Sequence, residues 1–158
     1  MANTKERTLI ILKPDALQRG LTGEILNRFE RKGIKLVGLK LLKLSNIILD
    51  KHYAQHKGKH FFGPIKKYMK MLPVVVAVLE GMEAVRVVRA VCGPTDGKNA
   101  PPGTIRGDFS MSIARNIVHS SEDLKAAKRE IKLYFKANEL FNYERPDVHF
   151  YYDVERGE

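Results

Sequence analysis

His119 stands directly before a short stretch of serine and acidic residues, Ser120-Ser121-Glu122-Asp123. Such a stretch resembles a helix-capping box with aspartate in the acid position, and it predicts that a helix begins beside the imidazole. The free N–H groups and the positive dipole end of a helix favour phosphate, and a neutral imidazole is a nucleophile. The sequence thus indicates a nucleophile next to a phosphate site, although a histidine before a helix more often has no function.

The segment upstream of this histidine is rich in glycine, proline and arginine. Residues 102–109 read PGTIRGDF, and the two glycines around Arg106 let the backbone approach a ligand closely. Arg115 and Asn116 come next, three residues or so before His119. A guanidinium can spread the charge that builds up on a transferring phosphoryl group. The pattern favours phosphoryl transfer, with a surface loop carrying a salt-bridged arginine as the alternative.

One lysine and several aromatic residues are candidates for the same site only in combination with the residues above. Lys13 ends the first apolar run, at a rim where open sheets often bind ligands, although a lysine there is more often a solubilising charge. Phe61, Phe62 and Tyr53 are candidates for stacking on a base, although aromatic residues at helical spacing are more often core. Neither a GxxxxGK[ST] nor a GxGxxG pattern is present, which excludes P-loop and Rossmann nucleotide sites.

The apolar spacing predicts the elements that must position these residues. Strands are predicted over residues 7–13, 34–44, 74–79 and 116–119. Helices are predicted over residues 23–31 (capped by Thr22), 45–57, 61–71, 82–91 and 122–135. Residues 93–115 contain so many glycines and prolines that neither helix nor strand is expected there, and a long loop of this kind usually exists for function.

This order of elements predicts an α/β (α+β) fold of the ferredoxin-like, split βαβ type, in which helices cover one face of an antiparallel sheet. We expect one domain over residues 1–158, with a C-terminal extension from about residue 143. Within that extension, residues 148–152 are candidates for pairing at a sheet edge. The fold by itself does not decide the function, because it hosts many, including RNA binding.

The composition narrows the class of partner. The net charge of +10 favours anionic partners such as nucleotides, nucleic acids or acidic surfaces. No apolar stretch is long enough to cross a membrane, and the single cysteine, Cys92, suggests neither a disulfide nor a zinc site. We therefore expect a cytoplasmic protein in which Cys92 belongs to the core.

Taken together, these stretches resemble the nucleoside diphosphate kinase family. The resemblance runs from about residue 7 to residue 141. Its most specific part is the PGTIRGDF run followed, at this spacing, by Arg-Asn-x-x-His-x-Ser. Further matching pieces are LKPDA from residue 12, HY from 52, FF from 61, YM from 68, PVV from 73 and EG from 80.

The resemblance implies transfer of a γ-phosphoryl group between nucleotides in a ping-pong cycle, with His119 as the residue that is phosphorylated. It implies phosphate and sugar contacts at Lys13, Arg89, Thr95, Arg106 and Asn116. It implies a base held by Phe61, Ile65 and Ile113 without readout of base edges, and support for the histidine from Tyr53, Ser121 and Glu130. Mg²⁺ is expected to arrive on the nucleotide phosphates, and a homo-oligomer is expected, with a hexamer favoured over a tetramer.

Several positions depart from the usual family pattern. Ser120 stands where glycine usually follows the histidine, which would put a side chain into a tight turn, and Glu122 is one methylene longer than the usual aspartate. Ala114 and Val88 replace glycines, and Gly97 lies where many members have proline. None of these changes removes a reacting group. The alternative hypothesis is a nucleic-acid or partner-binding module on the same fold, which the basic charge encourages.

Overall fold

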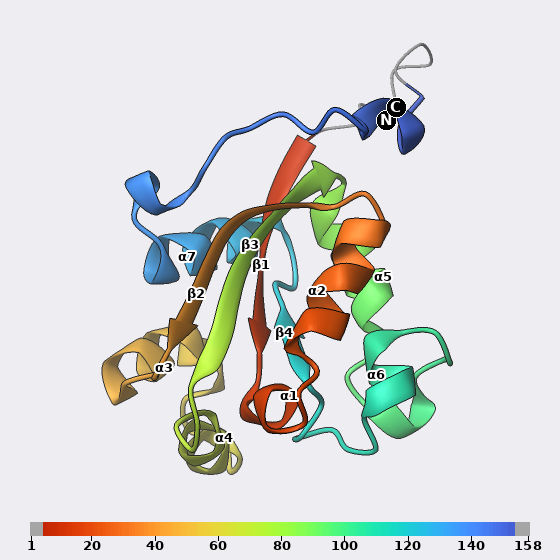
Figure 1. Cartoon of the computed structure of the whole chain (residues 1–158). Coiled ribbons are helices and arrows are strands. Elements are labelled where there is room, and N and C mark those ends of the chain that lie inside the picture. Colours follow the sequence, from red (N-terminus) through yellow and green to blue (C-terminus); the bar gives the residue numbers. More distant parts are fainter. Residues whose placement is uncertain (1–4, 154–158) are drawn as a thin grey trace.

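A four-stranded antiparallel sheet forms the centre of the molecule in the computed structural model, which describes residues 5–153. The strand order is β2-β3-β1-β4, so that β1 and β3 lie inside the sheet (Figure 1). This confirms the predicted ferredoxin-like arrangement. The sheet comprises β1 (Lys5–Leu12), β2 (Lys35–Leu42), β3 (Val74–Met82) and β4 (Val118–Ser120).

Helices fill the connections between these strands. The α-helices are α1 (Pro14–Gln18), α2 (Thr22–Arg31), α3 (Asn46–His52), α4 (Phe62–Met69), α5 (Ala84–Cys92), α6 (Ile105–Phe109) and α7 (Leu124–Tyr134). Short 3-10 helices are η1 (Ala54–His56), η2 (Gly97–Asn99), η3 (Ala137–Glu139) and η4 (Val148–Phe150).

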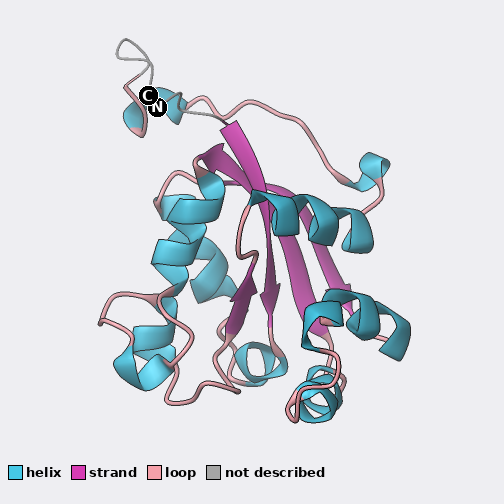
Figure 2. Cartoon of the chain, turned by 180° about the vertical axis from the view of Figure 1, so that it is seen from behind, coloured by secondary structure: helices cyan, strands magenta, loops and turns pink. Residues whose placement is uncertain are grey.

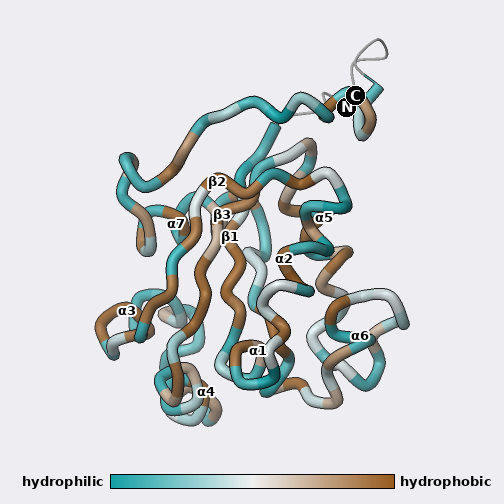
Figure 3. The backbone as a smooth tube through the Cα atoms, viewed as in Figure 1, coloured by the Kyte–Doolittle hydropathy of each residue, from teal (hydrophilic) through white to brown (hydrophobic). Residues whose placement is uncertain are grey.

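Strand β1 is apolar on both faces, and this alternation builds two cores. Ile10 and Leu12 point to one side, where they pack with Phe29 of α2 and Val88 of α5. Leu9, on the other side, packs in a second cluster with residues of α3 and α7. Figure 2 shows α7 lying across the face of the sheet opposite to α2 and α5, and Figure 3 shows the apolar strands between the layers. The expectation that helices cover only one face is therefore wrong, because a strand with two apolar faces must be covered on both.

Other local predictions also need correction. Residues 93–115 are not wholly irregular, because Thr104 caps helix α6 by accepting a hydrogen bond from the Gly107 N–H at 3.0 Å. Thr22 does not cap α2: it is the first residue of that helix, and the N-cap residue is Leu21. The Thr22 prediction misses the observed N-cap by one residue, which is the usual uncertainty of a helix end.

The C-terminal extension does not pair with the sheet. Residues 148–150 form the 3-10 helix η4, and the predicted edge pairing over 148–152 is wrong. Instead the Tyr152 hydroxyl donates to the Gly33 carbonyl at 3.2 Å, and the Lys35 ammonium donates to the Tyr143 carbonyl at 2.7 Å. Side-chain contacts with the sheet edge thus replace the predicted main-chain ladder.

The burial of Cys92 and the lengths of the helices bear on two further predictions. Cys92 is fully buried, which confirms its assignment to the core. None of the helices within residues 5–153 is both long enough and apolar enough to cross a membrane.

Substitution of Phe29 tests the core between α2 and the sheet. Its ring is fully buried, so Phe29→Ala removes buried apolar area and leaves a cavity, with an expected loss of about 3–5 kcal/mol in the free energy of unfolding. Glu30→Ala is a matched control on the exposed side of the same helix and should stay within about 0.5 kcal/mol of the wild type. Urea unfolding followed by circular dichroism measures both. Similar losses for the two variants would contradict this account of the core.

Candidate active site

A cleft of about 1210 Å³ opens between the α3–α4 segment, the loop before β4 and the start of α7. It is lined by all the predicted site residues except Ser121. These are Lys13, Tyr53, Phe61, Ile65, Arg89, Thr95, Arg106, Ile113, Asn116, His119 and Glu130. They come from segments far apart in the sequence, so only the fold brings them together.

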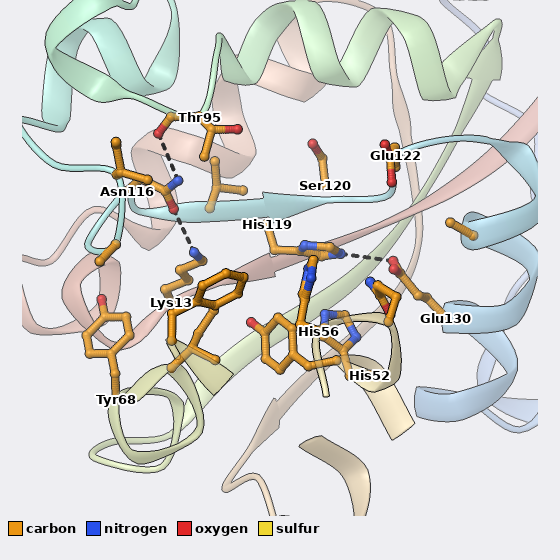
Figure 4. Close-up of a pocket in the computed structure, with 18 of the residues that line it drawn as sticks. Lys13, His52, His56, Tyr68, Thr95, Asn116, His119, Ser120, Glu122 and Glu130 are labelled. Atoms are coloured by element: carbon orange, nitrogen blue, oxygen red, sulfur yellow. Dashed lines mark hydrogen bonds and ion pairs between the residues drawn. The ribbon is translucent and has the colours of Figure 1, made fainter. Parts of the chain in front are cut away.

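The register of β4 directs His119 into this cleft. His119 pairs with Ile11 of β1, and directly opposed residues of antiparallel strands share a face of the sheet. Ile11 belongs to the core cluster beneath α3 and α7. His119 therefore faces the same layer, where its Nε2 lies 2.9 Å from a carboxylate oxygen of Glu130 on α7 (Figure 4).

Glu130 is a buried anion with hydrogen bonds. Its side chain is only 2% exposed, and the Ser121 hydroxyl donates to the same carboxylate oxygen at 2.7 Å. Burial disfavours the charged form, but the hydrogen bond from His119, nearby positive charge and the bond from Ser121 outweigh it and hold the pKa of Glu130 below its usual value. Ser121, the one predicted residue outside the lining, thus supports the site from behind. The ionised Glu130 favours the His119 tautomer that carries its proton on Nε2.

A strained turn precedes His119. Ile117 has a positive φ of 71°, which is rare for a β-branched residue, and the Val118 N–H bonds back to the Asn116 carbonyl at 2.7 Å. The Asp15 carboxylate accepts the Ile117 N–H at 3.1 Å, and the Lys13 N–H bonds to the Ile117 carbonyl at 2.8 Å. These bonds hold the strained residue in place. The predicted strand over 116–119 consequently begins only at Val118.

Arg106 is a buried cation that joins three parts of the site. Its guanidinium is 8% exposed and donates to the carbonyls of Gly93 at 2.5 Å, Val118 at 2.6 Å and Asn116 at 3.3 Å. An arginine has five N–H donors, so further donors remain for a ligand. The alternative of a surface loop with a salt-bridged arginine is wrong, because the partners of Arg106 are backbone carbonyls rather than a carboxylate.

Lys13 is likewise buried rather than solubilising, with an exposed fraction of 6%. Its ammonium donates to the Asn116 side-chain oxygen at 2.6 Å, and the Asn116 amide donates to the Thr95 carbonyl at 3.0 Å (Figure 4). Burial and the nearby positive charge of Arg106 lower the pKa of Lys13 to about 8, although Asp15 opposes this shift. This corner of the cleft therefore carries closely spaced positive charge, as an anion site requires.

The predicted phosphate seat at a helix N-terminus next to His119 needs correction. Helix α7 begins only at Leu124, and its N-cap residue is Asp123, whose carboxylate accepts the Ala126 N–H at 2.7 Å. A capping carboxylate already occupies this helix end and disfavours an anion there, whereas the cationic side chains of Lys13, Arg89 and Arg106 line the cleft.

His52 is a site residue that the sequence did not single out. Its ring is 1% exposed and packs edge-on against His119, with 4.6 Å between the ring centroids. Burial and the neighbouring His119 lower the pKa of His52 to about 3, so the ring is neutral at physiological pH. In the sequence, His52 belongs to the HY piece of the family resemblance, but no chemical role is predicted for it.

Comparison with known proteins decides the family. The sequence profile described as nucleoside diphosphate kinase matches residues 6–140. This chain belongs to the nucleoside diphosphate kinase family. A relative named nucleoside diphosphate kinase from Pyrococcus abyssi is 51% identical over 152 residues, which cover 94% of this chain and 96% of the relative.

Solved structures of nucleoside diphosphate kinases share the fold. The enzyme from Halobacterium salinarum, solved in complex with CDP, has a TM-score of 0.92 at 41% identity and covers 94% of this chain and 99% of its own. The enzyme from Borrelia burgdorferi, solved as a transition-state mimic with vanadate and ADP, has a TM-score of 0.87 at 39% identity, with 93% and 98% covered. The family resemblance drawn from the sequence is therefore confirmed.

One departure from the family pattern causes no backbone strain. Among residues 5–153, only Glu83 and Ile117 combine a positive φ with a side chain, so Ser120 does not occupy a left-handed turn. Ser120 is instead the last residue of β4, opposite Ile10. The expectation that its side chain crowds a tight turn is wrong.

Substitution of Gly107 tests how the loop holds Arg106. A Cβ at this position would lie 2.0 Å from the Pro101 carbonyl oxygen, so the loop must shift. Gly107→Ala should lower the free energy of unfolding by about 1–3 kcal/mol and reduce kinase activity. Gly63→Ala is the matched control, because nothing lies within 4 Å of its added Cβ, and it should not destabilise the protein. Thermal unfolding and turnover assays give the comparison, and a stable, fully active Gly107→Ala protein would refute this role of the loop.

Proposed function

We propose that this chain transfers the terminal phosphoryl group of a nucleoside triphosphate to a nucleoside diphosphate through a phosphohistidine at His119. The observation that carries the proposal is the 2.9 Å contact between His119 Nε2 and Glu130 inside a cleft lined by cations. Membership of the family supports the same reaction. The alternative of a pure nucleic-acid-binding module is not favoured, because binding alone has no need of an oriented imidazole.

The hydrogen bond to Glu130 selects the reacting atom of His119. With the proton on Nε2, the lone pair of the neutral ring lies on Nδ1. Nδ1 attacks the γ-phosphorus, the bond from that phosphorus to the β–γ bridging oxygen breaks, and the nucleoside diphosphate leaves. Glu130 stabilises the positive charge that the ring gains in this step. A second nucleoside diphosphate then takes the phosphoryl group by the reverse path, which gives the ping-pong cycle.

The cations of the cleft receive the phosphates. Lys13, Arg89 and Arg106 neutralise charge on the transferring group and on the bridging oxygen that leaves. Hydrogen bonds with the Lys13 ammonium and the Thr95 carbonyl fix the Asn116 side chain. Lys13 and Asn116 can therefore orient the phosphates and the sugar. The shared hydrogen bonds preorganise the donors before a nucleotide arrives.

The other end of the cleft suits the base. Phe61 offers an aromatic ring, and Ile65 and Ile113 supply apolar contacts, while the Tyr53 ring packs edge-on against His52 at 4.6 Å, on the side of His119. Stacking and apolar contacts recognise the flat face of a base and tolerate any of the common bases. We infer broad specificity for purine and pyrimidine nucleotides on this basis.

Mg²⁺ fits the site as a cation carried by the nucleotide. Magnesium prefers six oxygen ligands, whereas the one candidate metal group in the described part of the chain contains two histidines. Of the three lining carboxylates, Glu130 is engaged by His119 and Asp123 caps α7, which leaves Glu122 as a single exposed group rather than a cluster. The phosphates are therefore the proposed ligands, and the ion would contribute neutralisation of phosphate charge.

We further propose one domain over residues 1–158 with its C-terminal extension, a cytoplasmic location, and a homo-oligomer for which a hexamer is favoured over a tetramer. Exposed Leu39 and Leu41 on the outer strand β2 support assembly, since exposed apolar side chains on an edge strand favour association. Residues 1–4 and 154–158 of the proposed domain lie outside the described part of the chain.

Labelling tests the reaction directly. Wild-type protein mixed with γ-labelled ATP and Mg²⁺ should acquire an acid-labile label and pass it to added GDP. His119→Ala should lower the labelling by at least about a thousandfold, because it removes the nucleophile. His149→Ala, an exposed histidine in the C-terminal extension, should label normally. The kinase proposal fails if wild-type protein binds nucleotide and takes up no label.

The pH profile tests the role of Lys13. Its pKa of about 8 means that the free enzyme loses this positive charge as the pH rises through 8, so kcat/KM should decline there. The guanidinium of Lys13→Arg stays protonated throughout this range, so the variant should show no such decline even if its overall rate is lower. Steady-state kinetics from pH 6.5 to about 9.5 provide the measurement. An identical alkaline decline in both proteins would assign the titration to another group.

A further inference from the structure

Three metal-binding side chains meet at the inner end of the cleft. His52, His119 and Glu130 each offer one ligand atom, and these atoms all lie within 4.8 Å of one another. They come from α3, β4 and α7: α3 and α7 pack in the same core cluster, and β4 pairs with β1. Figure 4 shows the ring of His52 next to His119 on the side of Glu130. The group is rigidly supported, because His52 and Glu130 are almost wholly buried.

The proposed phosphoryl transfer leaves His52 without a chemical task. Its Nδ1 is buried and has no hydrogen-bond partner among residues 5–153. A buried polar atom without a partner is costly and rare in folded proteins. His52 therefore has unused donor or acceptor capacity directly beside the nucleophile.

We propose that His52, His119 and Glu130 form a site for a borderline transition-metal ion of the Zn²⁺ class, and that its occupation inhibits the kinase. Two imidazole nitrogens and one carboxylate oxygen are a ligand set that Zn²⁺ prefers, with a fourth position left for water. Tetrahedral bonds of about 2.0–2.1 Å place ligand atoms about 3.4 Å apart. Because the ligand atoms lie within 4.8 Å of one another, binding requires a shift of up to about 1.4 Å, most readily by the partly exposed ring of His119.

Inhibition follows from the tautomer of His119, and this step rests on the proposed function. A metal bond to Nε2 replaces the hydrogen bond to Glu130, and the proton of Nε2 moves through solvent to Nδ1. Glu130 stays a carboxylate and becomes a ligand. Nδ1 then has no lone pair with which to attack phosphorus. Arg129, whose guanidinium lies 3.6 Å from the other Glu130 oxygen, opposes the metal by repulsion and so limits its affinity.

The ligand chemistry separates this site from the magnesium of the substrate. Mg²⁺ is a hard cation that binds oxygen and sheds its water reluctantly, whereas Zn²⁺ accepts imidazole readily. Millimolar magnesium should therefore leave the site empty and the enzyme active. Zinc bound at this site should lower kinase activity, whereas magnesium should not bind there.

Cobalt spectroscopy tests binding without any activity measurement. Co²⁺ added to nucleotide-free protein should give the visible absorption of a tetrahedral site, and Zn²⁺ should displace it. His52→Gln and Glu130→Gln should each weaken binding by at least about a hundredfold, because even loss of an outer-shell partner costs 10–100-fold. His56→Gln, a histidine of the same cleft outside the ligand group, should bind like wild type. Circular dichroism shows which variants are folded, and wild-type affinity in either folded ligand variant overturns the site.

Labelling with γ-labelled ATP in excess Mg²⁺, with free Zn²⁺ fixed by a metal buffer, tests the inhibition. Wild-type labelling should fall as zinc occupies the site, and His52→Gln should need at least tenfold more zinc for the same loss. Normal labelling of zinc-loaded wild type overturns the inhibitory role. A failure of the kinase proposal gives a different result from a failure of the metal site. Wild-type protein without zinc would then take up no label, but the cobalt spectrum would still show the metal site.

Discussion

The buried carboxylate of Glu130 is the constraint on which the arrangement of the site depends. An ionised group that is 2% exposed must be hydrogen-bonded, or its burial costs more than the fold can offset. Its partners are His119 and Ser121, and the Ser121 hydroxyl also accepts the Leu9 N–H of β1 at 3.3 Å. Helix α7 and strands β1 and β4 are thereby fixed relative to one another. The requirement to satisfy one charge thus also fixes His119, the proposed nucleophile, and its tautomer.

The turn before β4 shows how the fold opposes local strain. A positive φ at a β-branched residue costs about 1–3 kcal/mol, and such a conformation persists only when its surroundings determine it. Asp15 and the Lys13 backbone hold Ile117 from one side, while Arg106 binds the carbonyls of Asn116 and Val118 on either side of it. The strained residue lets Asn116 and His119 reach the cleft together. Most of the site residues thus bind one another before any nucleotide is present.

The sequence predicted the outline of this structure well, because strong local patterns govern it. The order of strands and helices along the chain, the uninterrupted apolar run of β3 and the basic glycine-rich segment before His119 are all local signals. The predictions failed where long-range contacts decide. Helix α7 starts at Leu124 because Ser121 turns to the buried Glu130 instead of capping the helix. His52 was missed because a histidine on a buried helix face resembles a core residue until the neighbouring strand is placed.

The buried cations Lys13 and Arg106 favour a substrate that carries negative charge. Lys13 and Arg106 are both buried and have backbone or amide oxygens, not carboxylates, as their main hydrogen-bond partners. Their mutual repulsion and lost hydration make the charged lysine less stable than in water, which is why its pKa falls to about 8. In the proposed reaction, phosphate oxygens between these cations relieve both penalties at once. Binding of phosphate would therefore offset the free energy that the burial and mutual repulsion of the cations cost. This effect would be largest when negative charge accumulates on the transferring phosphoryl group.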